Sequence, residues 1–455
     1  MRVRTMLVVA AAAVTVVAAC SSSTKKPATT TVPATTAGGP ATSAATATSA
    51  AMATSAAANG ALPTVAPLPP VTGNTTTGVT ATQVKLGALI YKAFYADVVN
   101  GFNARLKREN DAGGVYGRKI VVDTVADDNQ TADQDLAAAK TLVQQDNVFA
   151  VAPVMTAALG GATFLETSKV PFFGWSIEPR WCGLNWGFGF QGNDCDQSTQ
   201  KRALDIPVAQ AKLFPDGDPK GKTIAVTSED NDSARAAANG AAKTWEAAGA
   251  KVVLVDTSIP SPPAVVGDFT PFAQKVMTSN NGGPPDYVEM VNSVSDTIGL
   301  FKKLSQLGYK GVAQGFTNYD PRLLGQTKGL SSEVGFAPYE DAASVPVVQQ
   351  MITDLKAFQS NIVLSQPAAA GYWIADFFIQ ALKKAGPNLT REALYNAING
   401  GFTYDNHGGT TPVQWPLAHT FSQAGFSFVT DAGDHFDVPV HLTAVPIIPN
   451  PAYKG

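Results

Sequence analysis

The chain has 455 residues, of which 45% are hydrophobic and 15% charged, and its formal net charge is −3. This length predicts more than one compact unit, since a single core rarely grows beyond roughly 250–300 residues. Without the basic residues of the first 26 positions, 29 Lys and Arg stand against 36 Asp and Glu, a charge near −7. This acidic balance argues against nucleic acid as a partner.

The first twenty residues have the pattern of an export signal. Arg2 and Arg4 provide a positive start, and Met6–Ala19 is an apolar run too short for a comfortable membrane span. Val17–Cys20 places small residues before a cysteine and resembles a bacterial lipobox. We therefore predict a signal peptide over 1–20 and a mature chain that begins at a lipidated Cys20. The alternative is an ordinary secretory signal in which this cysteine is incidental.

Residues 21–82 are of low complexity. They consist mainly of Ala, Thr, Ser, Pro and Gly, contain no Asp or Glu, and carry only the charges of Lys25 and Lys26. Such a segment cannot bury enough apolar area to offset the entropy lost on ordering. We predict a disordered tether over 21–82 that links the membrane to the folded part.

From residue 84 onward, short β-rich runs alternate with helical patterns. The first predicted strands are Val84–Ile90, Lys119–Val125, Val148–Val154 and Val170–Phe173. Between the first two, Val98, Phe102 and Leu106 recur every four residues, as in an amphipathic helix. Thr131–Gln134 has the spacing of a capping box before the next helix. This alternation predicts a parallel sheet with helices on both faces.

A second series with the same alternation of strands and helices begins at Lys222. Its predicted strands are Thr223–Thr227, Lys251–Asp256, Tyr287–Val291 and Gly311–Phe316. Its predicted helices are Ala236–Ala248 and one that opens at Ser295 and ends at Gly308, followed by Val347–Phe358 and Ala369–Ala385. The repetition predicts a second α/β lobe.

The segment Asp111–Ile120, with the sequence DAGGVYGRKI, resembles a glycine-rich segment of the type I periplasmic binding proteins. The most similar branch is the leucine/isoleucine/valine-binding one, which serves ABC importers of branched-chain amino acids, amides and urea. Asp127-Asp128 also fits that pattern, and the resemblance runs with gaps from about Val84 to Asp437. It implies two doubly wound parallel-sheet lobes joined by a three-stranded hinge, with a ligand cleft between their carboxyl ends.

Under this resemblance the first lobe comprises residues 83–205 and 338–410, and the second comprises 206–337 and 411–455. The chain departs from the family at two binding positions. Asn231-Asp232-Ser233 replaces a Tyr-Gly pair, and Met155-Thr156-Ala157 replaces a pair of hydroxyl residues. These departures leave an amino-acid ligand in doubt without affecting the fold.

The predicted ligand site collects residues that follow strands in both lobes. It comprises Phe94, Tyr95, Thr156, Ala157, Trp175, Ser176, Glu178, Asp232, Asn292, Ser293, Asn318 and Tyr319. The resemblance implies an aromatic lid at Phe94 and Tyr95, and a hydroxyl and helix-start N–H groups at Thr156 that suit an anionic group. Asp232 facing Glu178 would favour a solute with a cationic or many-hydroxyl end. The alternative for Asp232 is a helix cap.

Several aromatic side chains are candidates either for a ligand wall or for the core. They are Trp175, Trp181, Trp186, Phe188, Phe190, Tyr319 and Tyr372. Trp175 has the strongest case for the wall, because it directly follows a predicted strand. Cys182 and Cys195 remain if Cys20 is lipidated, and an even number of cysteines in an oxidising compartment predicts a disulfide. Two free buried thiols are the alternative.

No motif predicts catalysis, a metal or a cofactor. Gly187–Gly192 matches G-x-G-x-x-G but lies in an aromatic loop bracketed by cysteines, and Gly217–Thr223 is one residue too short for a P-loop and precedes a strand. The four histidines lack helical metal-ligand spacing, and no nucleophile elbow is present.

Together these observations predict a solute-binding lipoprotein on the extracytoplasmic face of the cell membrane, and not an enzyme. It would capture a small polar solute, such as an amino acid or amide, for an ABC importer. The expected partners are the solute and an ABC permease, with the membrane reached through the lipid anchor only, no cofactor, and a monomeric chain. The alternative is a ligand-sensing protein that signals through a partner without transport.

Overall fold

The computed structural model describes residues 65–196, 199–262, 264–316, 318–423 and 425–454. The predicted signal peptide, the predicted lipidation at Cys20 and most of the predicted tether therefore lie outside the described residues. None of the described helices is both long and apolar enough to cross a bilayer.

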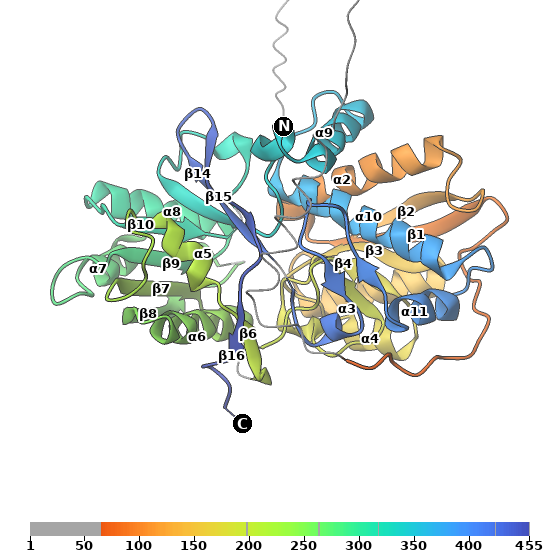
Figure 1. The fold of residues 1–455 in the computed structure, drawn as a ribbon, viewed down its shortest axis with the longest axis horizontal. Coiled ribbons are helices and arrows are strands. Elements are labelled where there is room, and N and C mark those ends of the chain that lie inside the picture. The colour runs from red at the N-terminus through yellow and green to blue at the C-terminus, as the bar shows by residue number, and fades with distance from the viewer. Residues whose placement is uncertain (1–64, 197–198, 263, 317, 424, 455) are drawn as a thin grey trace, which may run out of the picture. The chain divides into compact units, whose positions relative to one another are not determined.

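A sheet of five parallel strands, in the order β2-β1-β3-β4-β5, forms the centre of the first lobe among the described residues. Its strands are β1 (Gln83–Ile90), β2 (Lys119–Asp127), β3 (Ala150–Met155), β4 (Phe172–Gly174) and β5 (Gly187–Gly189). All six residues of β3 are buried, as expected for a central strand of a sheet covered on both faces. The helices are α2 (Lys92–Asp111), α3 (Ala132–Lys140), α4 (Ala162–Thr167), α9 (Pro346–Phe358), α10 (Gln366–Ala385) and α11 (Arg391–Asn399) (Figure 1).

The second lobe is built on a seven-stranded sheet within the described residues, in the order β15-β14-β11-β10-β9-β7-β8. Its strands are β7 (Thr223–Glu229), β8 (Lys251–Ile259), β9 (Tyr287–Val291), β10 (Val312–Gly315), β11 (Leu330–Val334), β14 (Phe426–Asp431) and β15 (Phe436–Thr443). The strands β7 to β11 are parallel, whereas β14 and β15 add to the edge in antiparallel fashion. The helices are α5 (Pro207–Gln210), α6 (Asp232–Ala247), α7 (Thr270–Met277) and α8 (Val294–Gln306).

Along the described chain, three passages connect the two sheets: between β5 and β7, between β11 and α10, and between β13 and β14. Beside the first and last passages, β6 (Arg202–Leu204) pairs with β16 (Ile447–Pro449). The hairpin of β12 (Thr403–Tyr404) and β13 (Val413–Gln414) precedes Trp415, whose ring lies 5.2 Å from that of Phe188 in β5. We therefore place the last passage after Trp415, later than the expected boundary at residue 410. The predicted fold of two parallel-sheet lobes is confirmed.

Residues 65–82 are bound to the first lobe, although composition predicted a tether as far as residue 82. The side chain of Asn396 exchanges two hydrogen bonds with the backbone of Val71, at 2.8 and 2.9 Å. The N–H and the hydroxyl of Thr75 both donate to the carboxylate of Glu392, at 2.9 and 2.6 Å. The tether prediction is therefore wrong for residues 65–82. Composition does not show that hydrogen bonds to α11 hold this segment in place, together with the packing of Leu68 and Val71 on the core of the first lobe.

Two glycines allow α2 and α10 to touch along their backbones. A Cβ on Gly101 would lie 1.8 Å from the carbonyl oxygen of Ala368, and a Cβ on Gly371 would lie 1.9 Å from that of Val98. No side chain fits at either position. Because α2 begins at the carboxyl end of β1, this close packing fixes the position of the aromatic residues in its first turn.

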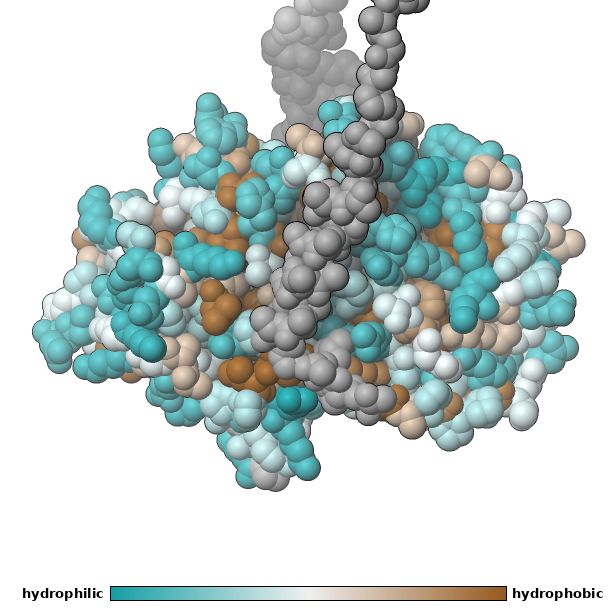
Figure 2. Space-filling model, viewed as in Figure 1, coloured by the Kyte–Doolittle hydropathy of each residue, from teal (hydrophilic) through white to brown (hydrophobic). Residues whose placement is uncertain are grey.

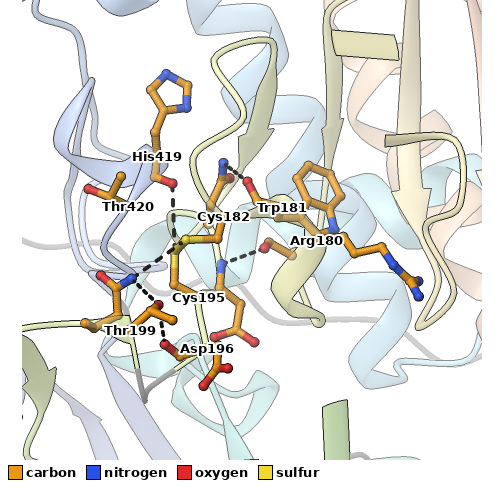
Figure 3. Close-up of a disulfide and its surroundings, with 12 residues drawn as sticks. Arg180, Trp181, Cys182, Cys195, Asp196, Thr199, His419 and Thr420 are labelled. Carbon is orange, nitrogen blue, oxygen red and sulfur yellow. Dashed lines mark hydrogen bonds between the residues drawn. A yellow bond between two sulfur atoms is a disulfide. The ribbon is translucent and has the colours of Figure 1, made fainter. Parts of the chain in front are cut away.

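The predicted disulfide between Cys182 and Cys195 is present and joins the segments on either side of β5 (Figure 3). The carbonyl oxygen of His419 points toward Cys195, with an S···O distance of 4.0 Å, while the imidazole ring of His419 points away from the disulfide. The bond closes a loop between two cysteines that are 13 residues apart in the sequence. Glu178 lies four residues before Cys182, outside this loop, and the disulfide ties the chain that follows Glu178 to the segment beyond β5.

The coloured face in Figure 2 is mainly hydrophilic, with hydrophobic residues in small separate areas. The large aromatic side chains of the candidate ligand wall are instead mostly internal. Trp181, Phe188, Phe190 and Tyr372 are fully buried, and Trp186 nearly so. For these five residues the structure supports the core interpretation.

Candidate ligand-binding site

A pocket of about 200 Å³ opens between the two lobes, where both sheets present the carboxyl ends of their strands. It is lined by Ala93, Phe94, Tyr95, Val294, Asp320, Arg322, Leu323 and Pro367. Open α/β sheets bind ligands at this edge because the strand ends splay apart there and leave loop groups free. Two of the predicted site residues, Phe94 and Tyr95, lie in this pocket.

Phe94 and Tyr95 occupy the first turn of α2, directly after β1. Their rings pack against Tyr91, with centroids 5.3 Å from Phe94 and 6.5 Å from Tyr95. Tyr95 interrupts the helix with φ −116° and ψ 16°. Burial, the charge of Glu229 and then that of Asp128 raise the pKa of Tyr95 to about 12. The Tyr95 hydroxyl of the first lobe therefore lies near carboxylates of both lobes.

Thr156 and Ala157 follow β3 but differ in exposure. Thr156 is fully buried, and its hydroxyl oxygen accepts the N–H of Ala158 at 3.0 Å. The side chain of Ala157 is exposed. Asp128, beyond the end of β2, is also fully buried, and it accepts the N–H of Gln130 at 2.8 Å. Burial raises the pKa of Asp128, while the hydroxyl of Thr156 lowers it. Thr156 thus sits beside a carboxylate, which opposes an anionic group at this position.

Trp175, Ser176 and Glu178 follow β4 as predicted. Trp175 is half-buried and packs edge-on against Phe190, at 6.2 Å between centroids. The Ser176 hydroxyl accepts the N–H of Asp194 at 2.7 Å. Glu178 is 3% exposed and accepts the N–H of Arg180 at 3.3 Å, capping a short helical turn. Burial raises its pKa. Ser176 and Glu178 therefore have structural hydrogen bonds of their own.

Asp232 does not face Glu178 in this structure. Its side chain is fully exposed and forms an ion pair with Arg235. Asn231, one residue earlier, caps α6 by accepting the N–H of Ala234 at 2.8 Å, so the capping alternative for Asp232 is also wrong. Asp232 is the first residue of α6, where an acidic side chain is favourable to the helix dipole.

Glu229, the last residue of β7, points into the protein where Asp232 was expected to act. Its carboxylate accepts the N–H of Ser293 at 2.7 Å. Asn292, at the end of β9, is buried, and its amide N–H₂ donates to Thr227 at 3.4 Å. Burial and then the charge of Glu229 raise the pKa of Asp296 to about 6. The structure therefore brings Asn292 and Ser293 together with two carboxylates.

Asn318 and Tyr319 follow β10 and are both buried. Tyr319 donates its hydroxyl to Glu340 at 2.5 Å and accepts the N–H of Tyr339 at 2.8 Å, which makes it a core residue between segments. Neither side-chain polar atom of Asn318 has a hydrogen-bond partner among the described residues. Nearby, Arg322 joins the lobes by pairing with Asp97 of α2 at 2.8 Å.

Sequence reasoning missed the two carboxylates of the second lobe and most of the pocket lining. Glu229 follows the predicted strand Thr223–Thr227 by two residues, so its position at a strand end was an available signal. Asp296 lies in the first turn of the helix predicted to open at Ser295 and was not predicted as a site residue. The missed pocket residues are Ala93, Val294, Asp320, Arg322, Leu323 and Pro367. They come from helix starts and turns whose positions depend on tertiary packing.

Within the part of the chain that the structure describes, no group of three or more His, Cys, Asp or Glu side chains is placed to hold a metal ion. The pocket is lined by the aromatic rings of Phe94 and Tyr95, by apolar side chains, and by the charged side chains of Asp320 and Arg322. They can stack on a ligand and accept hydrogen bonds from it. Two lobes with such a pocket between them define a solute-binding protein of the periplasmic type.

The chain belongs to the periplasmic binding protein family. A family profile described as Periplasmic binding protein matches residues 90–433, well over half of the sequence. It is a type I periplasmic binding protein of the leucine/isoleucine/valine-binding type, as the sequence resemblance predicted. No curated protein matches the chain significantly.

Solved structures of ABC transporter substrate-binding proteins share this fold. A fatty acid ABC transporter substrate-binding protein from Thermomonospora curvata has 17% identity and a TM-score of 0.67, over 81% of this chain and 94% of that one. LivJ from Streptococcus pneumoniae, in complex with isoleucine, has 16% identity and a TM-score of 0.59, over 81% and 99%. A solute-binding protein from R. palustris, in complex with benzoate, has 14% identity and a TM-score of 0.63, over 82% and 99%.

Proposed function

We propose that the protein is an extracytoplasmic lipoprotein that captures a small polar solute, an amino acid, an amide or a similar compound, and delivers it to an ABC permease. The observation that carries this proposal is the pocket between the lobes, in which Phe94 and Tyr95 of α2 meet Val294 and the turn around Arg322. A ligand there touches both lobes, so its binding energy favours a closed arrangement that a permease can recognise.

The similar structures support the proposal because their names include chemically different ligands. Their names include a fatty acid transporter component, an isoleucine complex and a benzoate complex. One fold therefore accommodates ligands of different charge, and the side chains at the cleft decide which solute is taken. For this chain, buried polar groups at the strand ends of both lobes favour a small polar solute over an aliphatic one.

The proposal is tested by a thermal-shift screen of amino acids, amides and amines against the full-length protein, followed by calorimetric titration of the solutes that raise the melting temperature. The variant Tyr95→Ala should weaken binding by roughly 10-fold or more, since burying a large side chain against a ligand contributes about 1.5–3 kcal/mol. Tyr453→Ala, near the C-terminus and away from the pocket, is the matched control and should leave affinity unchanged. Equal affinity of the Tyr95→Ala and wild-type proteins would contradict the proposal.

A further inference from the structure

The carboxyl edge of the second sheet holds two neighbouring carboxylates below the surface. Glu229 and Asp296 are each 6% exposed, and they come from the end of β7 and the first turn of α8. Ser293 donates its N–H to Glu229 at 2.7 Å. One oxygen of Asp296 is buried and has no hydrogen-bond partner among the described residues. Two acids this close concentrate negative charge at the cleft.

No ion pair neutralises this charge within the described residues. Each arginine at this edge pairs with other carboxylates: Arg235 with Asp230 and Asp232, Arg322 with Asp97 and Asp320, and Arg180 with Glu178. No ion pair of the described chain includes Glu229, Asp296 or the buried Asp128 of the first lobe. Buried carboxylates without a cation are costly, and a positively charged ligand would remove that cost.

An amide oxygen beside the carboxylates adds an independent observation. The parallel register of β7 and β9 pairs Ser228 with Val291, which brings the following residues, Glu229 and Asn292, side by side. Asn292 is 8% exposed, its N–H₂ group is directed to Thr227, and its side-chain oxygen accepts no hydrogen bond from any described residue. The unpartnered polar atoms of Asp296 and Asn292 are therefore both acceptors, which suit a ligand rich in donors.

The first lobe closes the site with an aromatic ring. Tyr95 lines the pocket between the lobes, and its pKa is raised by burial and by the charges of Glu229 and Asp128, in that order. The ring of Tyr95 thus lies within electrostatic reach of carboxylates on both sides of the cleft. An aromatic ring next to carboxylates is a favourable environment for an organic cation, whose charge is attracted to both.

We propose that the solute is an organic cation, whose ammonium or guanidinium group is bound by Glu229, Asp296 and Asn292 and is covered by Tyr95. The inference rests on the proposed solute-binding function and specifies its substrate class. An ammonium group offers three N–H donors and a guanidinium five, which matches the free acceptors. The apolar part of the solute packs against Phe94 and Val294. An anion such as benzoate would instead place its charge against three carboxylates.

Calorimetric titration of the full-length protein tests the inference with probes that differ in charge. Agmatine and 1,4-diaminobutane are the cations, L-isoleucine is the zwitterion, 1,4-butanediol is the neutral analogue of the diamine, and benzoate is the anion. A cation should bind at least roughly 100-fold more tightly than butanediol, because charge-assisted hydrogen bonds and ion pairs in a cleft contribute several kcal/mol. Its affinity should fall as salt is added.

Three variants assign the binding to the carboxylates. Glu229→Gln and Asp296→Asn keep the size of the side chain and one acceptor oxygen but remove the charge, and each should weaken cation binding by roughly 10-fold or more. Asp230→Asn is the matched control: it removes the same charge one residue from Glu229, but its side chain is exposed and pairs with Arg235. It should change affinity less than about 2-fold. Melting temperatures of the free variants at or above that of the wild-type protein exclude a folding defect, since removing an uncompensated buried charge should not destabilise the fold.

The outcomes separate this inference from the function on which it rests. Tighter binding of isoleucine, butanediol or benzoate than of either cation overturns the cation inference and leaves solute binding intact. Equal weakening by Asp230→Asn and Glu229→Gln also overturns it, since the charge would then act at long range without a built site. Failure of both cations to bind, when the thermal-shift screen finds another solute that does, overturns the cation inference alone, whereas the proposed function fails only if that screen finds no ligand.

Discussion

Glu229 and Asp232 lie three positions apart, yet the structure turns only the first of them inward. Glu229 ends a buried strand and accepts the N–H of Ser293, whereas Asp232 begins a surface helix and pairs with Arg235. The predicted strand ended at Thr227, whereas β7 continues to Glu229, so counting from the predicted end selected the wrong acid. The two residues between them, Asp230 and Asn231, complete the turn that reverses the direction of the side chains.

At the residue scale, Glu333 provides a test of how buried acids affect stability. Burial, and then the charge of Glu289, raises the pKa of Glu333 to about 8. A raised pKa in the folded state means that ionisation opposes folding, so the cost is absent below about pH 4.5 and grows up to about pH 8. Glu333→Gln should therefore stabilise the protein by on the order of 3 kcal/mol at pH 8 and by little at pH 4.

Urea unfolding of both proteins at several pH values measures this difference. Glu246→Gln, at an exposed acid paired with Lys243, is the control and should change stability by less than about 0.5 kcal/mol at any pH. A gain from Glu333→Gln that is the same at pH 4 and pH 8 would show that ionisation of Glu333 is not the cause.

The disulfide is a second feature at this scale. Replacing both Cys182 and Cys195 by Ala should lower the free energy of unfolding by about 3 kcal/mol, because the crosslink restricts the unfolded chain. Denaturant titration gives the value, and the wild-type protein under reducing conditions should behave like the variant. Labelling of two free thiols in the unfolded, unreduced protein would contradict the bond itself.

At the scale of elements, periodicity predicted the long helices and the buried strands well. The predicted helices Val347–Phe358 and Ala369–Ala385 correspond to α9 and α10, and the predicted strand Val84–Ile90 corresponds to β1 within one residue. β5 was missed, because its Gly187-Phe188-Gly189 sequence has little strand propensity. A Cβ on Gly187 would meet the ring of Phe172 at 2.5 Å, so packing against the neighbouring strand, and not phosphate binding, accounts for this glycine.

The candidate site was less predictable than the fold, because tertiary contacts that a local pattern does not contain bring its residues together. Phe94 and Tyr95 were predicted because they follow the first predicted strand and because the family resemblance implies an aromatic lid there. The turn around Arg322 joins the site only through tertiary contacts, such as the ion pair with Asp97. Thr131 has the sequence of a capping box, yet its hydroxyl donates to the carbonyl oxygen of Asp128 at 3.4 Å and does not cap α3. Local patterns do not decide between such competing partners.

The contact between α2 and α10 leads to a prediction at this scale. Gly371→Ala would place a methyl group against the backbone of Val98 and force the helices apart, which should destabilise the protein by about 3 kcal/mol. Gly267→Ala is the control: no atom lies within 4 Å of its Cβ position, so its effect should stay below about 0.5 kcal/mol. Thermal unfolding compares the two. Equal effects would contradict the close backbone contact.

At the scale of the whole molecule, the bound segment of residues 65–82 shortens the predicted tether at its folded end. Thr75 and Val71 attach this segment to α11 of the first lobe. These hydrogen bonds attach the segment to the first lobe. The same segment leads toward the predicted anchor.

At the scale of the whole molecule we predict membrane attachment through Cys20. Cys20→Ala should move the protein from the membrane fraction to the soluble fraction of fractionated cells, because a lipid on this cysteine is the proposed anchor. Immunoblotting of both fractions measures the shift, and Cys182→Ala serves as a cysteine substitution that leaves the anchor in place. Retention of Cys20→Ala in the membrane fraction at the wild-type level would place the anchor elsewhere.

The location of a bound solute tests the central claim most directly. A crystal structure of the protein with the tightest-binding probe should show that compound between the lobes, in contact with Tyr95 of α2 and with Glu229 at the end of β7. Density for the probe at any other place, such as the cavity of about 700 Å³ around Lys212 and Lys310 at the opposite end of the second sheet, with an empty cleft, would contradict the account.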